Sequence, residues 1–261
     1  MRFLVTGAAS GLGAALTRAW RARGDDVLAT DLRPSRDLGD ATAVGGGIDL
    51  GLDVTDDDHW AAALAEVERR WGGLDVLVNN AGVAGGGRLD VATFEEWRWI
   101  TEINLFGVVR GTRTFVPMFK RQRSGHVVNV ASLAGLVHPA GMASYNAVKA
   151  AVVALTETTG HELAAYGVRA SVVCPSYFRT NLLSSMQGAD AAIAGVVAHL
   201  VESSPLTADD IAAAVVAGVD RGDELIVPDQ PARDAWDLKQ RDRAAYDAVM
   251  RAQAAKLDRL T

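Results

Sequence analysis

The chain has 261 residues, of which 49% are hydrophobic and 22% charged, as in a soluble globular protein with an ample core. The net charge of −6 is spread along the sequence, so no basic patch indicates binding to nucleic acid or to an anionic membrane. Cys174 is the only cysteine, which excludes an internal disulfide. No apolar run reaches membrane-spanning length, and Met1 leads into an apolar stretch without a signal peptide, so we expect a cytoplasmic protein.

Short β-rich runs alternate with helical patterns along the chain. One of the helical patterns covers the stretch from Ile100 to Phe119. This alternation predicts right-handed crossovers and a parallel sheet, and the middle strands lack the in/out alternation of a sheet with one exposed face. We predict an α/β fold with one doubly wound domain of about seven parallel strands and helices on both faces. The predicted strands cover residues 3–6, 26–30, 49–54, 75–80, 126–132, 169–175 and 224–228.

The stretch TGAASGLG, residues 6–13, follows the first predicted strand and opens a helix. Gly7 permits a tight turn, Gly11 allows close approach of a phosphate, and Gly13 permits close packing of the helix. The helix N-terminus can then bind a dinucleotide pyrophosphate. The glycine spacing differs from the common G-x-G-x-x-G pattern, and a tight connection without a ligand is the alternative. Its place between strand and helix favours nucleotide binding.

Asp31 ends the second predicted strand, eighteen residues after Gly13. A carboxylate there can accept hydrogen bonds from the adenosine ribose hydroxyls, and it repels a 2′-phosphate. The sequence therefore favours NAD over NADP as the cofactor. Arg33, two residues later, could attract the extra phosphate, but we interpret it as a surface arginine.

These motifs, with LDVTD (52–56), NNAG (79–82), INLFG, VASLAG and YNAVK, resemble the short-chain dehydrogenase/reductase family over roughly residues 2–228. The resemblance implies a Rossmann-like fold and an NAD(P)-dependent oxidoreductase. It also implies that the cofactor is bound by Gly7, Ser10, Gly11, Leu12, Gly13, Asp31, Asp53, Val54, Asn80, Ala81, Gly82, Tyr145, Lys149, Pro175 and Thr180.

Tyr145 and Lys149 lie four apart in an apolar helical pattern, so both side chains emerge on one side. Alone, they could be a tyrosine at the edge of the core and a lysine reaching solvent. The resemblance makes them catalytic together with Asn104 and Ser132. It implies that Tyr145 is the general acid/base, that Ser132 holds the substrate oxygen, that Lys149 binds the nicotinamide ribose, and that Asn104 fixes a water.

The charge of Lys149 beside Tyr145 leads us to expect a lowered pKa for the phenol. Asn104 as a helix cap and Ser132 as a turn residue are the alternatives to catalytic roles. One departure from the family pattern is Pro175-Ser176 in place of the usual Pro-Gly. Thr180 still stands where the family holds the nicotinamide carboxamide, so we expect only a modest change in geometry.

The family topology implies that segments after the fourth, fifth and sixth strands line the substrate site. They are mostly apolar, and the nearest basic residue, Arg179, is equally consistent with a surface role. Such walls suit a lipophilic ketone or secondary alcohol. His138 could contact the substrate, although we favour a loop role. The expected substrate contacts are Ser132, Leu133, His138, Met142, Tyr145, Tyr177, Phe178, Leu182 and Met186.

Residues 229–261 extend beyond the usual length of the family, so we divide the chain into a catalytic domain (1–228) and a helical extension (229–261). In the extension, Tyr246, Val249, Met250, Leu257 and Leu260 recur at helical spacing. This helix could pack on its own subunit, form a subunit contact or, least in keeping with its mixed charge, lie on a membrane. We expect a homodimer or homotetramer.

The sequence thus predicts an NAD-dependent alcohol dehydrogenase or ketone reductase that acts on a steroid, an aryl or alkyl ketone, or an acyl chain, with no metal. An NADP-linked 3-oxoacyl reductase is the alternative enzyme. A nucleotide-binding sensor without catalysis is a further alternative. A sensor has no need of Asn104, Ser132, Tyr145 and Lys149 together, so we favour the enzyme.

Overall fold

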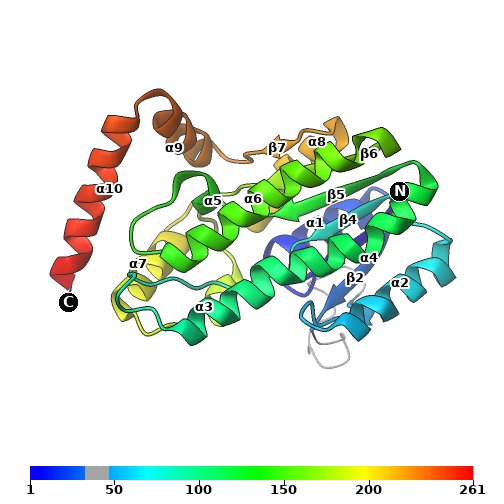
Figure 1. Cartoon of the computed structure of the whole chain (residues 1–261), viewed down its shortest axis with the longest axis horizontal. Coiled ribbons are helices and arrows are strands. Elements are labelled where there is room, and N and C mark those ends of the chain that lie inside the picture. The colour runs from blue at the N-terminus through cyan, green and yellow to red at the C-terminus, as the bar shows by residue number, and fades with distance from the viewer. Residues whose placement is uncertain (33–46, 261) are drawn as a thin grey trace.

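The first strand, β1, lies inside the sheet because it pairs on both sides, with β2 and with β4. The computed structural model describes residues 1–32 and 47–260, and within them seven strands form one sheet in the order β3-β2-β1-β4-β5-β6-β7 (Figure 1). Every neighbouring pair is parallel, which confirms the predicted fold class. The strands are β1 (Arg2–Thr6), β2 (Asp26–Asp31), β3 (Leu50–Gly51), β4 (Val76–Asn79), β5 (Gly125–Val130), β6 (Val168–Val173) and β7 (Leu225–Ile226).

Helices cover both faces of this sheet, because alternate residues of each strand point to opposite sides. Phe3 and Val5 belong to the core shared with α1 and α8, whereas Leu4 belongs to the core shared with α2 and α4. The helices are α1 (Gly11–Ala22), α2 (Asp57–Trp71), α3 (Phe94–Thr101), the π-helix η2 (Glu102–Phe106), α4 (Gly107–Gln122), α5 (Ala134–Val137), α6 (Ala143–Leu163), α7 (Ala191–Glu202), α8 (Ala208–Arg221), α9 (Gln230–Arg241) and α10 (Arg243–Leu257), with the short 3₁₀ turns η3 (Ala164–Tyr166), η4 (Asn181–Ser185) and η5 (Asp258–Leu260).

The predicted strand at 49–54 is too long, because only Leu50–Gly51 pair with β2. After them the backbone leaves the sheet to start α2. Asp53 Oδ1 accepts from the N–H and hydroxyl of Thr55 at 2.9 and 2.7 Å, and Asp56 caps the helix. The strands predicted at 126–132, 169–175 and 224–228 also end sooner, at Val130, Val173 and Ile226. Ser132 and Pro175 therefore lie in loops just beyond the carboxyl ends of their strands.

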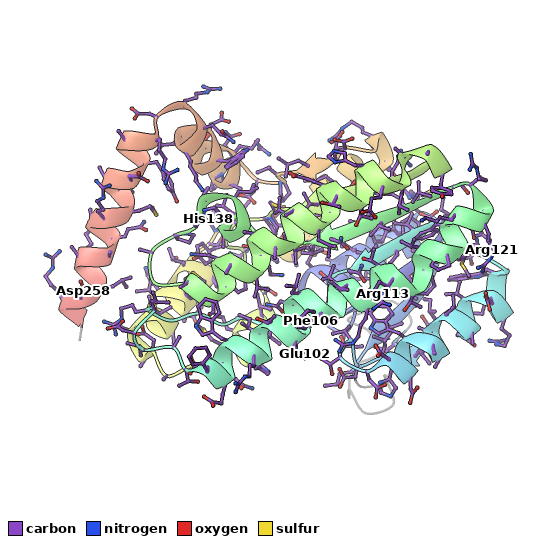
Figure 2. The ribbon with its side chains drawn as sticks, viewed as in Figure 1. Glu102, Phe106, Arg113, Arg121, His138 and Asp258 are labelled. Carbon is purple, nitrogen blue, oxygen red and sulfur yellow. The ribbon has the colours of Figure 1, made fainter. Side chains whose placement is uncertain are left out.

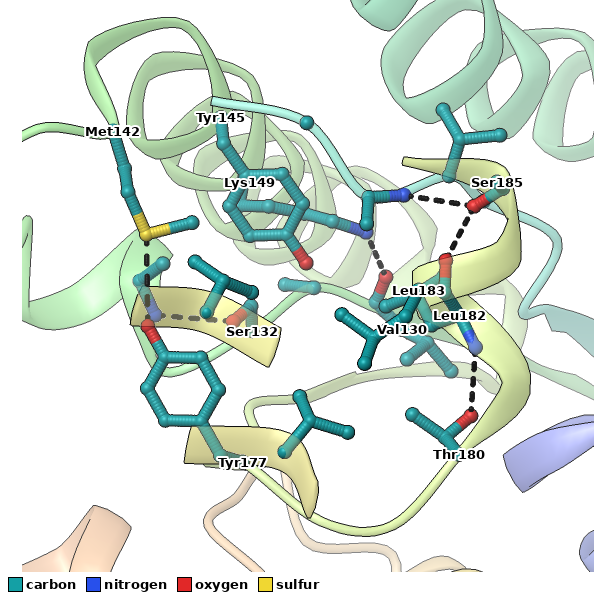
Figure 3. A pocket seen from close by; sticks show the side chains of 18 of the residues that line it. Val130, Ser132, Met142, Tyr145, Lys149, Tyr177, Thr180, Leu182, Leu183 and Ser185 are labelled. Carbon is teal, nitrogen blue, oxygen red and sulfur yellow. Dashed lines mark hydrogen bonds between the residues drawn. The ribbon is translucent and has the colours of Figure 1, made fainter. Parts of the chain in front are cut away.

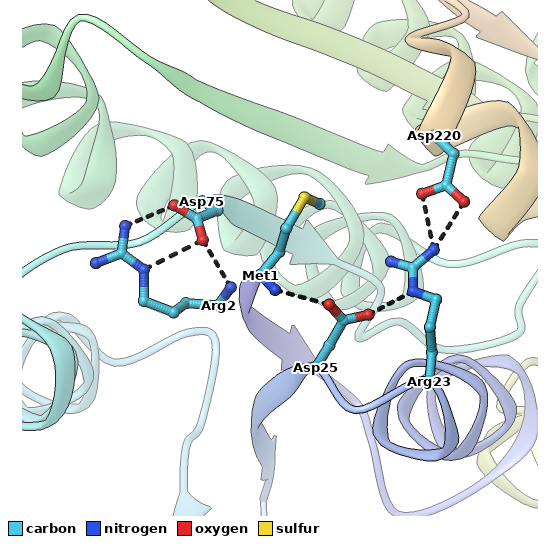
Figure 4. Close-up of polar contacts among 6 residues, drawn as sticks. All are labelled: Met1, Arg2, Arg23, Asp25, Asp75 and Asp220. Carbon is cyan, nitrogen blue, oxygen red and sulfur yellow. Dashed lines mark hydrogen bonds and ion pairs between the residues drawn. The ribbon is translucent and has the colours of Figure 1, made fainter.

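Ion pairs lie at the amino ends of the central strands, away from these loops (Figure 4). Arg2 pairs with Asp75 at 2.5 Å, and Asp25 accepts from both the Met1 amino group at 2.7 Å and Arg23 at 2.6 Å. Partly exposed pairs of this kind contribute about 0–1 kcal/mol each. The amino ends of the strands therefore have a structural role, and the carboxyl ends are left for the chemistry.

The extension after β7 packs on its own chain. The Tyr246 hydroxyl donates to the Val137 carbonyl at 2.5 Å, and Leu257 joins a core cluster that includes Ile193. This is the first of the three arrangements that we predicted for this helix. The boundary at residue 228 stays a prediction, as does a subunit contact through the outer face of α10, where Val249 is exposed. Within residues 1–32 and 47–260, no helix is both long and apolar enough to cross a bilayer.

Candidate active site

A cavity of about 1810 Å³ extends along the carboxyl ends of the strands. The strand order reverses between β1 and β4, and such switch points are where doubly wound sheets bind ligands. Sites for a single small molecule usually have volumes of about 300–1,000 Å³. The cavity therefore has room for a dinucleotide and a second molecule together.

The glycine turn between β1 and α1 forms one end of the cavity. Gly11 has a φ of +52°, and a Cβ on it would lie 2.5 Å from Thr180 Oγ1. A Cβ on Gly13 would lie 2.2 Å from the Gly7 carbonyl oxygen, so α1 needs glycine there in order to pack against the turn. The N-cap Ser10 makes no side-chain hydrogen bond to the first turn of α1. The first-turn N–H groups are thus left for a ligand, and the turn fits a dinucleotide pyrophosphate.

Thr6 and Asn80 hold this turn against β4. The Thr6 hydroxyl accepts from the N–H groups of Asn80 and Ala81 at 3.0 and 2.9 Å. The Asn80 amide donates to the carbonyls of Thr6 and Gly7 at 2.8 and 3.2 Å. Thr6 was not among the predicted site residues, and its only sequence signal is that it opens the TGAASGLG motif.

Asp31 is fixed at the end of β2, beside the glycine turn. Its Oδ2 accepts from the Ala9 N–H at 3.0 Å, and its Oδ1 accepts from the Leu32 N–H at 2.8 Å. The carboxylate lines the cavity and keeps lone pairs for ribose hydroxyls. Arg33, the residue that could oppose the predicted preference for NAD over NADP, lies outside the described residues.

Most of the predicted cofactor contacts line the cavity together. Gly13 does not, because it packs behind the turn. Those that line it are Gly7, Ser10, Gly11, Leu12, Asp31, Asp53, Val54, Asn80, Ala81, Gly82, Tyr145, Lys149, Pro175 and Thr180.

Ser132, Tyr145 and Lys149 meet in the middle of the cavity (Figure 3). Tyr145 and Lys149 follow one another on the buried face of α6, and Ser132 comes from the loop after β5. The Tyr145 phenol lies close enough to the Ser132 hydroxyl for that hydroxyl to lower its pKa. The Lys149 ammonium donates to the Val130 carbonyl at 3.1 Å and lies 5.7 Å from the centre of the Tyr145 ring.

Burial governs the pKa values of this pair. It raises the pKa of Tyr145 to about 12, and the nearby Ser132 hydroxyl opposes this change. It also lowers the pKa of Lys149 to about 8. Both changes follow from the cost of a charge in a site that excludes water. Our expectation of a lowered pKa for the phenol is therefore wrong for the chain alone, because desolvation is the largest influence on Tyr145.

Asn104 is wholly buried behind the cavity, in the π-helix η2. Its Oδ1 accepts from the Val83 N–H at 2.8 Å, and its Nδ2 donates to the Val83 carbonyl at 3.0 Å. The side chain thus holds the loop after β4 and caps no helix. The stretch from Ile100 to Phe119 is helical as predicted, and the π-helix lies within it between α3 and α4. Single π turns inside helices occur frequently at functional sites.

The expected substrate contacts divide into two sets. Leu133, Met142, Tyr177, Phe178 and Leu182 line the cavity with Ser132 and Tyr145, whereas His138 and Met186 do not. His138 is exposed beside α5 (Figure 2), where its ring nitrogens contact the Gly135 carbonyl at 3.2 Å and the Lys239 ammonium at 2.8 Å. Met186 packs against the cluster that contains Tyr145. The loop role that we favoured for His138 agrees with this position.

The extension supplies a wall of the cavity that the sequence analysis missed. One face of α10, formed by Tyr246, Met250, Gln253 and Leu257, lines the cavity at spacings of four, three and four residues. The apolar members of this face were visible as a helical pattern. That they meet the cavity was not, because no local pattern shows which surface a helix will contact.

Ser176, at the departure from the family's Pro-Gly, connects the cofactor loop to the extension. Its N–H and its hydroxyl donate to the two carboxylate oxygens of Asp229 at 2.9 and 2.6 Å. Asp229 also caps α9 by accepting from the Ala232 N–H at 2.9 Å. The change that we expected to be only geometric thus anchors the start of α9.

The chain belongs to the short-chain dehydrogenase/reductase family, since residues 2–190 match the family described as short chain dehydrogenase. The protein is therefore an oxidoreductase of this family. It is 35% identical over 187 residues to a 3-oxoacyl-(acyl-carrier-protein) reductase of Thermotoga maritima, covering 70% of this chain and 76% of that protein. It is 34% identical over 194 residues to trans-4-hydroxycyclohexanecarboxylate dehydrogenase of Sinomonas cyclohexanicum, covering 70% of this chain and 74% of that protein.

Solved structures agree with this assignment. A short-chain dehydrogenase/reductase from Burkholderia phymatum in complex with NAD has a TM-score of 0.83 and 28% identity, covering 92% of this chain and 93% of that one. A short-chain dehydrogenase from Burkholderia cenocepacia in complex with NADP has a TM-score of 0.78 and 27% identity, covering 95% and 96%. The family therefore binds NAD or NADP, and the choice made by this chain depends on its own residues.

Proposed function

We propose that this protein is an NAD-dependent alcohol dehydrogenase or ketone reductase that acts on lipophilic secondary alcohols and ketones. The observation that carries the proposal is the meeting of Ser132, Tyr145 and Lys149 inside one cavity with the glycine turn. A nucleotide-binding sensor would not require a buried phenol beside the hydroxyl of Ser132. We therefore place the sensor last among the candidate functions.

Bound NAD(H) supplies the chemistry of hydride transfer, and the chain supplies orientation and proton transfer. With its pKa raised to about 12, Tyr145 carries its proton at neutral pH and can donate it from the phenol oxygen to a ketone oxygen. Ser132 holds the same substrate oxygen and stabilises the charge that builds there. In the direction of oxidation, the alcohol proton passes back to Tyr145.

Lys149 supports both directions. Its pKa of about 8 keeps much of the ammonium charged near neutral pH, close to the phenol that must lose or gain a proton. We propose that it also binds the nicotinamide ribose. Asn104, which lies behind Gly82 and close to Lys149, is proposed to fix a water for proton relay.

Asp31 supports NAD as the cofactor. Its carboxylate is held over the glycine turn by two backbone N–H groups, so a 2′-phosphate there would meet a fixed negative charge. A charge-assisted contact with the ribose is worth roughly 1.5–3 kcal/mol, or about a tenfold to hundredfold preference in affinity. An NADP-linked 3-oxoacyl reductase is the second candidate, supported by the Thermotoga maritima relative.

The apolar lining supports a lipophilic substrate. Leu133, Met142, Phe178 and Leu182 line the cavity together with Tyr145. A steroid, an aryl or alkyl ketone, or an acyl chain would each suit such a wall. We propose that the enzyme is a homodimer or homotetramer, to be checked by light scattering, and that it acts in the cytoplasm.

The test is a panel of ketones mixed with NADH or NADPH, followed by the loss of reduced-cofactor absorbance, with Tyr145→Phe as the matched control. We expect turnover with NADH that the control loses. Binding of NADH without turnover of any ketone or alcohol would support the sensor instead. Turnover only of 3-oxoacyl thioesters with NADPH would support the second candidate.

A further inference from the structure

The extension brings positive charge to the substrate end of the cavity. Lys256 and Arg259 flank Leu257 at the end of α10, and both line the cavity. Among the other basic residues, Arg98 of α3 and Lys149 of α6 also line the cavity, whereas Arg179 donates to the Ser204 carbonyl at 2.9 Å and does not line it. Lys256 and Arg259 are therefore the cations that the extension adds to the cavity lining.

The side chains of Lys256 and Arg259 have no hydrogen-bond or ion-pair partner within residues 1–32 and 47–260. The carboxylates that line the cavity are all engaged. Asp31 accepts from backbone N–H groups, Asp53 from Thr55, and Glu102 pairs with Arg110 at 2.6 Å. In a chain with a net charge of −6, two unpartnered cations on one wall are an unbalanced charge that an anion could satisfy.

Asp258, the carboxylate between Lys256 and Arg259 in the sequence, acts on Arg88. It lies at the tip of α10 (Figure 2). Arg88 also pairs at 2.8 Å with Asp190, the buried N-cap of α7. The tip of α10 is thus directed towards the loop after β4 through Asp258, while Lys256 and Arg259 remain available to the cavity.

The end of α10 is close to the catalytic centre. Leu257 and Tyr145 belong to one core cluster. A Cβ on Gly141, four residues before Tyr145, would lie 2.3 Å from Ile193 Cδ1 and 2.9 Å from Leu257 Cδ1. The helix end therefore packs onto the loop that leads into α6. A lipophilic molecule with its reacting carbon at Tyr145 can extend along this wall and reach the cations.

We infer that the substrate is amphiphilic: its ketone or alcohol lies at Tyr145, an apolar body contacts α10, and an anionic group at the far end pairs with Lys256 and Arg259. This inference rests on the proposed function and specifies its substrate class. The simplest source of the anionic group is a carboxylate, so the substrate is an oxo acid or hydroxy acid. A phosphate on a thioester carrier would offer the same chemistry.

The experiment compares methyl ketones of the series CH₃CO(CH₂)ₙCOO⁻ with their methyl esters, over a range of chain lengths, as substrates of the full chain. We expect one window of chain length in which kcat/KM for the acid exceeds that for the ester by about tenfold. That advantage should fall as salt is raised, because the cations are exposed to solvent. The best chain length measures the distance from Tyr145 to the cations.

The double variant Lys256→Gln/Arg259→Gln should lose the advantage of the acid while it reduces the esters as well as the wild type does. Arg251→Gln, an exposed position on the same helix outside the cavity lining, is the matched control and should keep the advantage. Equal kcat/KM for acids and esters at every length, or an advantage that survives the double variant, would overturn the inference.

Two further experiments distinguish a carboxylate from a phosphate as the anionic group, and a failure of the anion site from a failure of the proposed function. A 3-oxoacyl coenzyme A favoured over its N-acetylcysteamine thioester, together with acids no better than esters, would point to a phosphate and overturn the carboxylate. If no ketone is reduced with either cofactor, the proposed function fails. Calorimetric binding of an oxo acid, compared between the wild type and the double variant, then tests the anion site by itself.

Discussion

Ser176 and Asp229 are joined by two hydrogen bonds, from the N–H and the hydroxyl of Ser176 to the two carboxylate oxygens of Asp229. Ser176 follows Pro175, which lines the cofactor cavity, and Asp229 is the N-cap of α9. The contact therefore couples the loop after β6, which we propose meets the cofactor, to the extension that forms the opposite wall of the cavity. Asp229 is only 3% exposed, so its carboxylate depends on these partners.

Ser176→Ala removes the hydroxyl and should destabilise the docking of α9 and α10. We expect a loss of about 1–2 kcal/mol in unfolding free energy, because the buried carboxylate loses one of its donors. The loosened extension should be cleaved faster by protease and should raise KM for bulky ketones more than the Kd for NADH. Ser203→Ala, which removes an exposed hydroxyl bonded to the His199 carbonyl, is the control. Equal protease resistance of the two variants would contradict the coupling.

Tyr145→Phe keeps the ring and its packing but removes the proton that the mechanism requires. Turnover should fall by about 10²–10⁴-fold, while the Kd for NADH, measured by fluorescence titration, stays within about twofold. Normal folding, checked by circular dichroism, makes the comparison valid. Residual turnover near that of the wild type would remove Tyr145 from the proposed role of general acid/base.

Asp31→Ser tests cofactor choice. The wild type should show higher kcat/KM with NADH than with NADPH, and the variant should narrow or reverse that ratio, because the repulsion of the 2′-phosphate is removed. Steady-state rates with both cofactors and one ketone give the ratio directly. A wild type that prefers NADPH would mean that Asp31 does not govern this end of the cavity.

His126 should make stability depend on pH. It is 2% exposed within the sheet, and burial, with the charge of Arg169, lowers its pKa to about 4. The Ser171 hydroxyl donates to the Asp223 carbonyl at 2.6 Å, so the His126 Nε2–H donates to Ser171. Among the described residues, His126 Nδ1 has no hydrogen-bond partner. Protonation would bury an unpaired charge.

His126 takes up a proton near pH 6.5 in the unfolded chain but only near pH 4 in the folded chain. The folded state is therefore at full stability above pH 6.5 and loses stability as the pH falls below it. On the order of 3 kcal/mol should be lost between pH 6.5 and pH 4. His126→Gln should flatten this part of the curve in urea unfolding, whereas the exposed His161→Asn should not. Parallel curves for the wild type and His126→Gln would show that other groups cause the acid sensitivity.

The sequence by itself determined the sheet and much of the cavity that we assign to the cofactor. Glycines at 7, 11 and 13 report local backbone demands, a positive φ or a missing Cβ, and such demands can be read from residue types and spacing. Asp31 could be placed because a strand end is set by where the apolar run stops. Tyr145 and Lys149 share one face because the helical repeat puts residues four apart together.

The tertiary structure decided whatever depends on residues far apart in the chain. Asn104 bonds to Val83, 21 residues away, and no local pattern distinguishes that contact from a helix cap. The direction of the Tyr145 pKa depends on how completely its neighbours exclude water, so burial overrode the lysine that adjacency had favoured.

The end of the cavity that we assign to the substrate also depends on contacts between distant segments. The helical repeat of Tyr246, Met250 and Leu257 showed an apolar face, but only docking through Asp229 and Tyr246 decided that this face meets the cavity. The charges of Lys256 and Arg259 were visible as residues, yet their role depends on what stands opposite them. Local features can be predicted from neighbouring residues, whereas contacts between distant segments are decided only when the whole core packs.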